Sequence, residues 1–260
     1  MEIDADTKYF SLRKDEVINM KNTKKNNKKV RAGSKDMWNA FMVEGAEFTE
    51  NDIPVCPTVL TEKPKRIVTW LEAKEIHKQM MKKDKDYYCD AFICFYVDDQ
   101  YFDGQRTSVW TFPGLAMRVI SHFRGIISPD FSTFMDFPEP ISEFNTYRMR
   151  AFGHWIGKER KEVINNVRWG LPHTFRYCFD GIPQNSVVAI GTVGGSPRKL
   201  EDRERFEEGL FEMVKRLNPH TIIVYGSAKY PCFDLLREKG IEIIAHQGQT
   251  NAAYERSVKK

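Results

Sequence analysis

Short apolar runs alternate with amphipathic segments along most of this chain, and this alternation constrains the fold more than any other feature of the sequence. Apolar runs of about 4–8 residues are typical of buried strands, whereas apolar residues at every third or fourth position are typical of helices that cover a sheet. The segment 201–217 has the second pattern, because Phe206, Leu210, Met213 and Leu217 fall on one stripe. The predicted strands are 66–70, 91–97, 125–128, 163–168, 187–193, 221–225 and 241–245, and the predicted helices are 72–83, 113–123, 141–156, 174–179, 201–217 and 232–239.

Regular succession of strand and helix predicts a mainly parallel sheet covered by helices, in one α/β domain over residues 36–250. We favour a TIM-barrel-like sheet of seven to eight strands, because the strand–helix units follow one another without a break or a long crossover. An open doubly wound sheet is the alternative. In both arrangements the ligand site is expected at the carboxyl ends of the strands.

The positive charge of the chain is concentrated in one short segment. The chain has 40 Lys and Arg against 36 Asp and Glu, a net charge of +4, but residues 21–35 alone contribute +7 and leave −3 for the rest. That segment has too few apolar residues to form a core, so we expect residues 1–35 to be a disordered basic tail and residues 251–260 to be a second tail. The basic tail either binds nucleic-acid phosphates without sequence preference or only keeps the protein soluble. The predicted nucleic-acid-binding residues are Lys24, Lys25, Lys28, Lys29 and Arg31.

Composition excludes several classes of protein. A chain with 41% hydrophobic and 29% charged residues is neither wholly disordered nor fibrous. Its longest apolar runs are strand-sized, whereas a membrane-spanning helix needs about 20 apolar residues. The five cysteines are odd in number and widely spaced, which argues against a disulfide framework or a zinc site. We therefore expect reduced thiols, a cytoplasmic location and no membrane partner, while the oligomeric state stays open.

Acidic residues follow several of the predicted strands. Asp98 and Asp99 come after the second strand, and Asp130 comes after the third strand, directly behind a proline. Carboxylates at neighbouring strand ends suit a divalent metal such as Mg²⁺, or a general acid and a general base. Aspartate is also common in turns and caps, so a purely structural role explains the same residues. No set of metal ligands is predicted, and the cofactor stays open.

Arg148 lies in the third predicted helix, on a stripe that begins at Ile141 and Phe144 and should face the sheet. An arginine buried against apolar surface needs a partner, because an unpaired buried charge is costly. We expect this partner to be Asp130, with Asn145 one turn earlier on nearly the same face of the helix. The pair is either a structural ion pair or part of a site for an anionic group. Asp130, Asn145 and Arg148 are therefore the predicted catalytic residues.

The loop after the fifth predicted strand has the composition of a phosphate-binding loop. Two adjacent glycines let backbone amides approach an anion, and the helix that starts near residue 201 points its amino end toward the loop. The loop matches neither GxGxxG nor GxxxxGKS, and a simple turn between strand and helix is the alternative. The predicted phosphate-binding residues are Gly194, Gly195, Ser196, Arg198 and Lys199.

Four motifs in this order carry a family resemblance: SPDFSTFMDFPEPISEFNTYRMRAFGHWIG, VINNVRWG, YCFDGIPQNSVVAIGTVGG and IIVYGS. The chain resembles the bacterial and phage family called domain of unknown function 4417 over residues 52–245. The resemblance implies an origin in bacterial chromosomes, phages or other mobile elements, and it implies no particular reaction. It supports treating Asp130, Asn145 and Arg148 as one constellation. The positions that match the family pattern are Asp130, Phe131, Ser132, Asn145, Tyr147, Arg148, Arg150, Trp169, Gly170 and Gly181.

Three functions fit these features, and whether the protein is an enzyme stays open. The first is an enzyme that acts on a nucleotide or nucleic acid, with metal-dependent phosphoryl chemistry at the strand ends as one form of it. The second is a non-catalytic nucleic-acid-binding accessory protein of a phage or mobile element, whose affinity comes from residues 21–35. The third is a protein that binds or sequesters a small phosphorylated ligand in the strand-end pocket.

Overall fold

The apolar runs of the sequence form one parallel sheet whose strands lie in chain order. A computed structural model describes residues 36, 38–192 and 200–246, and all strand and helix counts below refer to these residues. Seven strands form the sheet in the order β1 to β7, and every neighbouring pair is parallel. The strands are β1 (Ile67–Thr69), β2 (Cys89–Cys94), β3 (Phe123–Ile127), β4 (Glu162–Asn166), β5 (Val187–Gly191), β6 (Thr221–Tyr225) and β7 (Glu242–His246).

Five α-helices connect these strands or follow them in the same succession. They are α2 (Trp70–Met80), α3 (Pro113–Ile120), α4 (Glu139–Lys158), α5 (Leu200–Leu217) and α6 (Pro231–Glu238). Three short 3₁₀ helices, η1 (Ala40–Val43), η2 (Asp99–Tyr101) and η3 (Pro172–Arg176), lie in the connecting segments. The helix α2 begins with a capping box, in which Thr69 and Glu72 each bond to the other's backbone amide.

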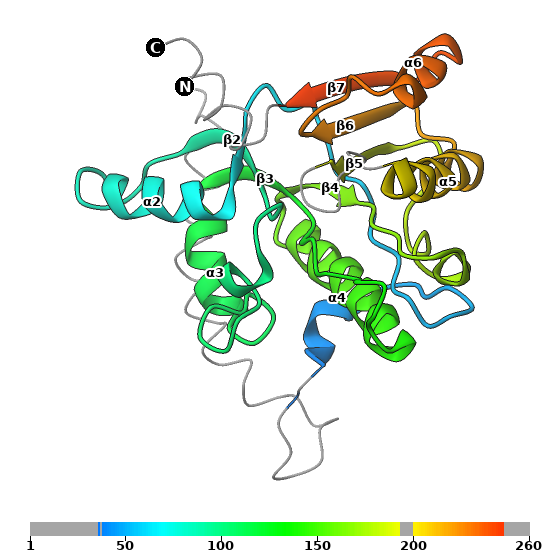
Figure 1. Cartoon of the computed structure of the whole chain (residues 1–260). Helices are drawn as coiled ribbons and strands as arrows, with labels where there is room; N and C mark the ends of the chain where they lie inside the picture. The colour runs from blue at the N-terminus through cyan, green and yellow to red at the C-terminus, as the bar shows by residue number, and fades with distance from the viewer. Residues whose placement is uncertain (1–35, 37, 193–199, 247–260) are drawn as a thin grey trace, which may run out of the picture. The chain divides into compact units, whose positions relative to one another are not determined.

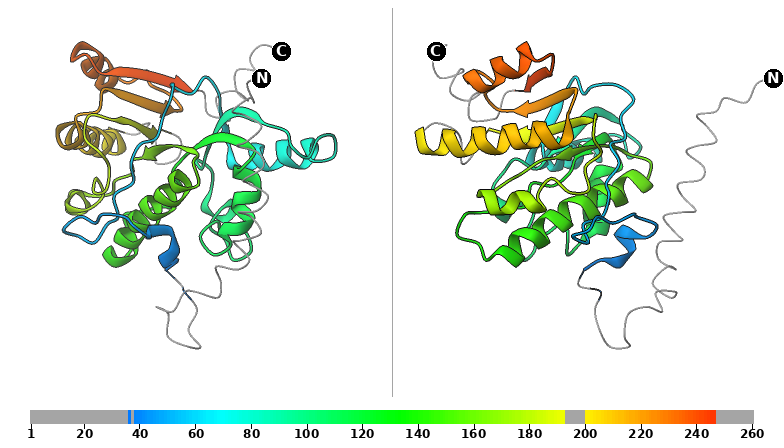
Figure 2. Two further views of the ribbon diagram at one scale, coloured as in Figure 1. Left: turned by 180° about the vertical axis from the view of Figure 1, so that it is seen from behind. Right: turned by 90° about the vertical axis from the view of Figure 1, so that its right-hand side faces the viewer.

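The sheet is curled, and the helices lie along its outer side (Figure 1). The right-hand view of Figure 2 looks onto α5 and α6, which cover the part of the sheet around β5 to β7. Two aromatic side chains give evidence of the curl. The rings of Tyr96, two residues after β2, and Tyr225, on β6, stack across the inner side of the sheet with their centroids 5.2 Å apart. The strands β2 and β6 are not neighbours in the sheet. A flat sheet would hold them well apart, since adjacent strands are spaced by about 4.7–4.9 Å.

Parallel strands that pair in chain order are typical of a barrel, which is the arrangement that the sequence favours. The alternative of a doubly wound sheet is wrong, because the strand order does not reverse at any point. Within the described residues no ladder joins β7 to β1, so the sheet is a half-barrel with two edges.

The strands β3 to β6 are buried on both faces of the sheet, which explains why they read as continuous apolar runs, whereas the edge strand β7 is partly exposed. Successive residues of β3 show the division, since Ile126 packs in the outer core under the helices and Ile127 packs in the inner core. The outer core has two parts, one around β1–β3 with α2, α3 and α4, and one around β5 and β6 with α5 and α6. The inner core is smaller and brings together side chains from β2 to β6.

Residues 56–63, here called the amino-end strap, cross the amino ends of several strands. Val59 forms a backbone bridge with Val163 of β4, and the Thr61 hydroxyl donates to Glu162, the first residue of that strand, at 2.7 Å. Further along, Lys63 forms an ion pair with Glu242 at the start of β7. The strap therefore links β4 to the edge strand β7 at the end of the sheet opposite to the carboxyl ends.

All seven predicted strands are confirmed, but two helix predictions need correction. The predicted helix 174–179 is wrong, because that segment continues the short helix η3 into turns. The predicted stripe of α4 is wrong at its start, since Ile141 and Phe144 are exposed, although Arg148 further along is buried. The predicted tails, residues 1–35 and 251–260, lie outside the described residues. Among the helices of the described part, none is both long enough and apolar enough to span a bilayer.

Candidate functional site

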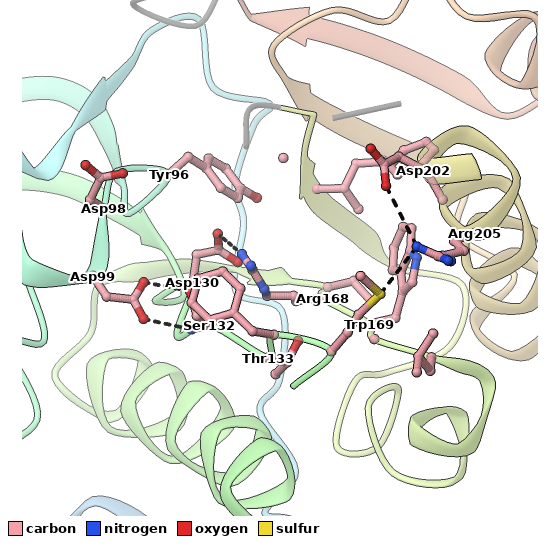
Figure 3. Close-up of a pocket in the computed structure, with 18 of the residues that line it drawn as sticks. Tyr96, Asp98, Asp99, Asp130, Ser132, Thr133, Arg168, Trp169, Asp202 and Arg205 are labelled. Carbon is pink, nitrogen blue, oxygen red and sulfur yellow. Dashed lines mark hydrogen bonds and ion pairs between the residues drawn. The ribbon is translucent and has the colours of Figure 1, made fainter. Parts of the chain in front are cut away.

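A pocket of about 650 Å³ opens at the carboxyl ends of β2 to β5. Its walls come from the loops after β2, β3 and β4, from the end of β5 and from the first turns of α5 (Figure 3). This is the position at which parallel α/β sheets place their ligand sites, because the connecting loops there are free to carry polar side chains.

A chain of hydrogen bonds connects two side chains of the pocket, Tyr96 and Asp130, through the buried Asn166. Tyr96 donates its phenolic O–H to Asn166 Oδ1 at 2.9 Å, and Asn166 Nδ2 donates to Asp130 Oδ1 at 2.8 Å. The other oxygen of Asp130, Oδ2, forms an ion pair with Arg168 Nη1 at 2.7 Å. Burial raises the pKa of Tyr96 well above its ordinary value, and the neighbouring Asp130 carboxylate adds to the effect. Tyr96 therefore stays protonated as a donor, and Asp130 is fixed in orientation by a partner on each oxygen.

Asp99 forms a second acidic position on the wall next to the loop after β3. Its two oxygens accept hydrogen bonds from Ser132, Oδ1 from the hydroxyl at 2.8 Å and Oδ2 from the backbone amide at 3.2 Å. Burial raises the pKa of Asp99 above its ordinary value, although the two Ser132 bonds act in the opposite direction. Asp98, one residue earlier, also lines the pocket but is exposed. The two adjacent carboxylates therefore differ, and only Asp99 is held by hydrogen bonds from a fixed neighbour.

The opposite wall is aromatic and basic. Trp169 is partly exposed and packs against Phe206 of α5, with ring centroids 5.4 Å apart. Arg205, one turn inside α5, reaches over this wall to Met135 Sδ at 3.6 Å and lies 3.9 Å from Asp202 (Figure 3). The pocket therefore places a flat apolar surface and an exposed guanidinium across from its carboxylates.

One buried hydroxyl in the pocket wall has no partner among the described residues. Thr133 is 7% exposed and lines the pocket, yet its Oγ1 has no hydrogen bond within that part of the chain. A buried hydroxyl without a partner is costly, so the native protein needs an explanation for it. A ligand or a water molecule in the pocket would supply the missing bond.

The predicted catalytic residues do not form the predicted pair. Asp130 lines the pocket as expected, but its arginine partner is Arg168, in the loop directly after β4. Arg148 instead pairs with Asp103 at 2.8 Å, and both Arg148 and Asn145 lie behind the pocket wall rather than on it. The predicted Arg148–Asp130 ion pair is therefore wrong, because the loop after β2 brings a nearer carboxylate to Arg148. The chemical roles of Asp130, Asn145 and Arg148 stay predictions.

Sequence reasoning did not assign a role to Arg168, Arg205, Tyr96 or Thr133. Arg168 was nonetheless detectable, because it is the last residue of the predicted strand 163–168, and ligand-binding side chains are expected at that end of a strand. Thr133 and Arg205 gave no such signal, since neither belongs to a recognisable motif. The predicted phosphate-binding loop (Gly194, Gly195, Ser196, Arg198 and Lys199) and the predicted nucleic-acid-binding lysines lie outside the described residues.

The described side chains do not fit a protein-built metal centre. Over residues 36, 38–192 and 200–246, no three His, Cys, Asp or Glu side chains gather closely enough to hold an ion. In the pocket, both oxygens of Asp130 are already engaged by Arg168 and Asn166. We therefore derive no metal-dependent step from this geometry.

Comparison with known proteins gives the chain its family. A family match spans residues 52–247, which includes all seven strands up to residue 246 and every pocket residue described above. The chain belongs to the family described as Domain of unknown function (DUF4417). This confirms the resemblance seen in the sequence motifs of the DUF4417 region.

Phage proteins are among the relatives of this DUF4417 chain. It is 32% identical to the "Gene 1 protein" of Mycobacterium phage L5 over 157 residues, which is 60% of this chain and 66% of that protein. It is 33% identical to the "Gene 1 protein" of Mycobacterium phage D29 over 141 residues, which is 54% of this chain and 50% of that protein. The matches thus span between half and two thirds of the relatives' own length. No solved structure matches the chain.

Proposed function

We propose that the strand-end pocket binds a phosphorylated ligand of nucleotide size, and that the protein is a nucleotide-directed protein of a phage or mobile element. The observation that carries this proposal is Arg168, whose side chain is 28% exposed in the pocket and is held by Asp130 at 2.7 Å. In the described part of the chain Asp130 is the only hydrogen-bonding partner of this guanidinium. A guanidinium has five N–H donors, so most of its donors are available to a phosphate.

The rest of the pocket supports a ligand with both a charged and a planar part. Its volume of about 650 Å³ lies within the range of about 300–1,000 Å³ that is usual for small-molecule sites. The partly exposed faces of Trp169 and Phe134 offer surfaces on which a planar ring stacks. Arg205 lies near the amino end of α5, where the helix dipole also favours an anion. These features together favour a nucleotide over an unphosphorylated ligand.

The test is nucleotide binding by the full-length protein, measured by isothermal titration calorimetry. The probes are the four common ribonucleoside triphosphates and inorganic phosphate. Arg168→Met should weaken nucleotide binding roughly 10- to 100-fold, because hydrogen bonds to a charged group contribute about 1.5–3 kcal/mol. Arg176→Met, a change at an exposed arginine outside the pocket, is the matched control and should leave the affinity unchanged. Absence of nucleotide binding by the wild-type protein, or equal effects of the two substitutions, would contradict the proposal.

The same mixtures separate an enzyme from a binding protein. Phosphorus NMR follows whether a bound triphosphate is converted to products over time. If the wild-type protein converts the triphosphate and Asp130→Asn does not, the protein is an enzyme. If the wild-type protein binds the triphosphate without converting it, the protein sequesters its ligand.

A second candidate function is favoured by the charge of residues 21–35. This segment has seven basic residues and no acidic residue, which suits sequence-independent contact with nucleic-acid phosphates. The two functions are compatible, since they use different parts of the chain.

A further inference from the structure

Two residues predicted to be catalytic, Asn145 and Arg148, belong to a hydrogen-bonded network behind the pocket wall. Arg148 Nη1 pairs with Asp103 Oδ1 at 2.8 Å, while Arg148 Nε and Nη2 both donate to Asn145 Oδ1, at 3.1 and 2.6 Å. The Arg148 guanidinium also lies 3.9 Å from the ring centroid of Phe131. With only 9% of the residue exposed, Arg148 is held on several sides and does not line the pocket.

The network continues from Asn145 to the pocket wall. Because Asn145 Oδ1 accepts from Arg148, its Nδ2 is turned toward the Ser132 carbonyl, to which it donates at 2.5 Å. Ser132 in turn donates its hydroxyl and its amide N–H to the two oxygens of Asp99. The backbone closes the network, since the Asp103 amide donates to the Asp99 carbonyl at 2.6 Å. Asp99, Asp103, Ser132, Asn145 and Arg148 thus tie the loop after β2 to the loop after β3 through α4.

We infer that Asn145 and Arg148 are positioning residues that hold Ser132, and through it the carboxylate of Asp99, at the pocket wall, where Asp99 accepts a hydrogen bond from the ligand. The inference rests on the proposed function for the ligand, but the network itself is a property of the protein without ligand. Each Asp99 oxygen accepts one bond from Ser132 and keeps acceptor capacity for a second partner. Thr133, next to Ser132, presents to the same pocket a buried hydroxyl that has no partner in the described part of the chain.

This arrangement indicates what the ligand offers at that wall. A carboxylate accepts hydrogen bonds, and the Thr133 hydroxyl both donates and accepts. The wall therefore suits amino, imino or hydroxyl groups, such as those on a nucleobase edge or a sugar. The guanidiniums of Arg168 and Arg205 are the corresponding partners for phosphate.

The test uses the pKa of Asp99 in the full-length protein without ligand, measured by carboxyl ¹³C NMR. Among charged side chains, Arg168 and Asp130 are the leading influences on the pKa of Asp99, and neither is changed. Ser132→Ala removes one hydrogen bond to the Asp99 carboxylate and should raise its pKa. Arg148→Lys keeps a cation next to Asp103 but loses the two guanidinium N–H groups that orient Asn145. This variant should therefore also raise the pKa of Asp99. The rise in the double variant should be smaller than the sum of the two single rises, because the hydroxyl bond can be lost only once, whereas the backbone bond from Ser132 remains to be weakened.

Two further variants make the outcome decisive. Asn145→Ala removes the amide link without touching Asp103 and should produce the same rise as Arg148→Lys. Arg176→Lys, at an exposed arginine outside the network, should leave the pKa of Asp99 unchanged. An Asp99 pKa that is unchanged or lowered in the Arg148 and Asn145 variants, or that rises additively in the double variant, would overturn the inference. Failure of nucleotide binding alone would overturn only the proposed function, since the titration contains no nucleotide.

Discussion

Three arginines near the pocket differ in burial and in hydrogen-bond partners, and these differences determine whether each can bind a ligand. Arg150 is fully buried, and within the described residues its partners are all backbone carbonyls, those of Asn166, Cys178 and Asp180. Burial lowers its pKa to about 10. Arg148 is nearly as buried and has a carboxylate and an amide as partners, whereas Arg168 keeps a guanidinium exposed in the pocket. Only the last of the three is placed to bind a ligand directly.

A glycine on α5 sets the position of the aromatic pocket wall. A Cβ atom added at Gly209 would overlap the indole of Trp169. Gly209→Ala should therefore destabilise the protein by about 1–3 kcal/mol, the usual cost of forcing an extra methyl group into a packed site. Urea unfolding followed by circular dichroism measures this change, and displacement of the indole should also alter the tryptophan fluorescence.

Gly114→Ala is the matched control, because Gly114 is also helical but exposed, and a Cβ there meets no atom within 4 Å. Alanine favours helix over glycine by up to about 1 kcal/mol, so this variant should be as stable as the wild type or more stable. Equal free energies of unfolding for the two variants would contradict the role given to Gly209.

At the scale of elements, the amino-end strap is held to the sheet by a buried charge cluster. Glu162, at the start of β4, accepts from Arg124 Nε and Nη2, each at 3.0 Å, and from Thr61 Oγ1 of the strap at 2.7 Å. The Arg124 side chain is 8% exposed and that of Glu162 is 15% exposed. Burial alone would raise the pKa of Glu162, but the hydrogen bonds from Arg124 and Thr61 outweigh it and leave the pKa lowered.

Glu162→Gln should destabilise the protein at pH 7 by about 1.5–3 kcal/mol, because it removes the charge from a hydrogen-bonded pair with a buried arginine. A carboxyl group with a lowered pKa in the folded state stabilises that state above its unfolded pKa and loses this contribution as the pH falls through its folded pKa. The difference between wild type and variant should thus be full at pH 7 and shrink as the pH falls below about 4.5. Urea unfolding at a series of pH values measures it.

Glu75→Gln is the control for this charge effect, since the Glu75 side chain is 55% exposed and lies 3.9 Å from Lys78. Exposed ion pairs contribute about 0–1 kcal/mol, so the control should change little at any pH. A destabilisation of Glu162→Gln that is independent of pH would show that packing, rather than charge, holds the strap.

At the scale of the whole molecule, the chain combines a slightly acidic α/β body with a short, strongly basic segment. The two are expected to bind different partners, a small phosphorylated ligand in the pocket and nucleic acid at residues 21–35. The net charge of +4 therefore describes neither part.

Replacing the basic side chains within the full-length protein tests this division. With Lys24, Lys25, Lys28, Lys29 and Arg31 changed to Gln, oligonucleotide affinity should fall and depend less steeply on salt. The slope of log K against log salt should lose up to about 0.9 for each phosphate contact removed from duplex DNA. Fluorescence anisotropy with a labelled duplex measures both quantities. Nucleotide binding in the pocket serves as the internal control and should not change, whereas an unaltered salt slope would exclude the segment as the nucleic-acid-binding site.

The sequence by itself determined the strand–helix succession of the fold, because that succession depends on local periodicity. Seven apolar runs became seven parallel strands, and the acidic residue after the third run, Asp130, lines the pocket. The same reasoning gave a wrong prediction for the segment 174–179. A few apolar residues there have helical spacing, but the stretch is too short and too rich in turns to form a stable α-helix.

Only the tertiary structure decided which side chains meet. Asp130 is 18 positions before Arg148 and 38 before Arg168, yet it pairs with Arg168, because neighbouring parallel strands bring their carboxyl ends together. Arg148 pairs with Asp103 for the corresponding reason, since the loop after β2 passes beside α4. The curl that stacks Tyr96 on Tyr225 is likewise a sum of twists and packing over five strands, which no single segment encodes. Local patterns specify elements, whereas the partners in a site depend on strand register and loop paths that exist only in the folded chain.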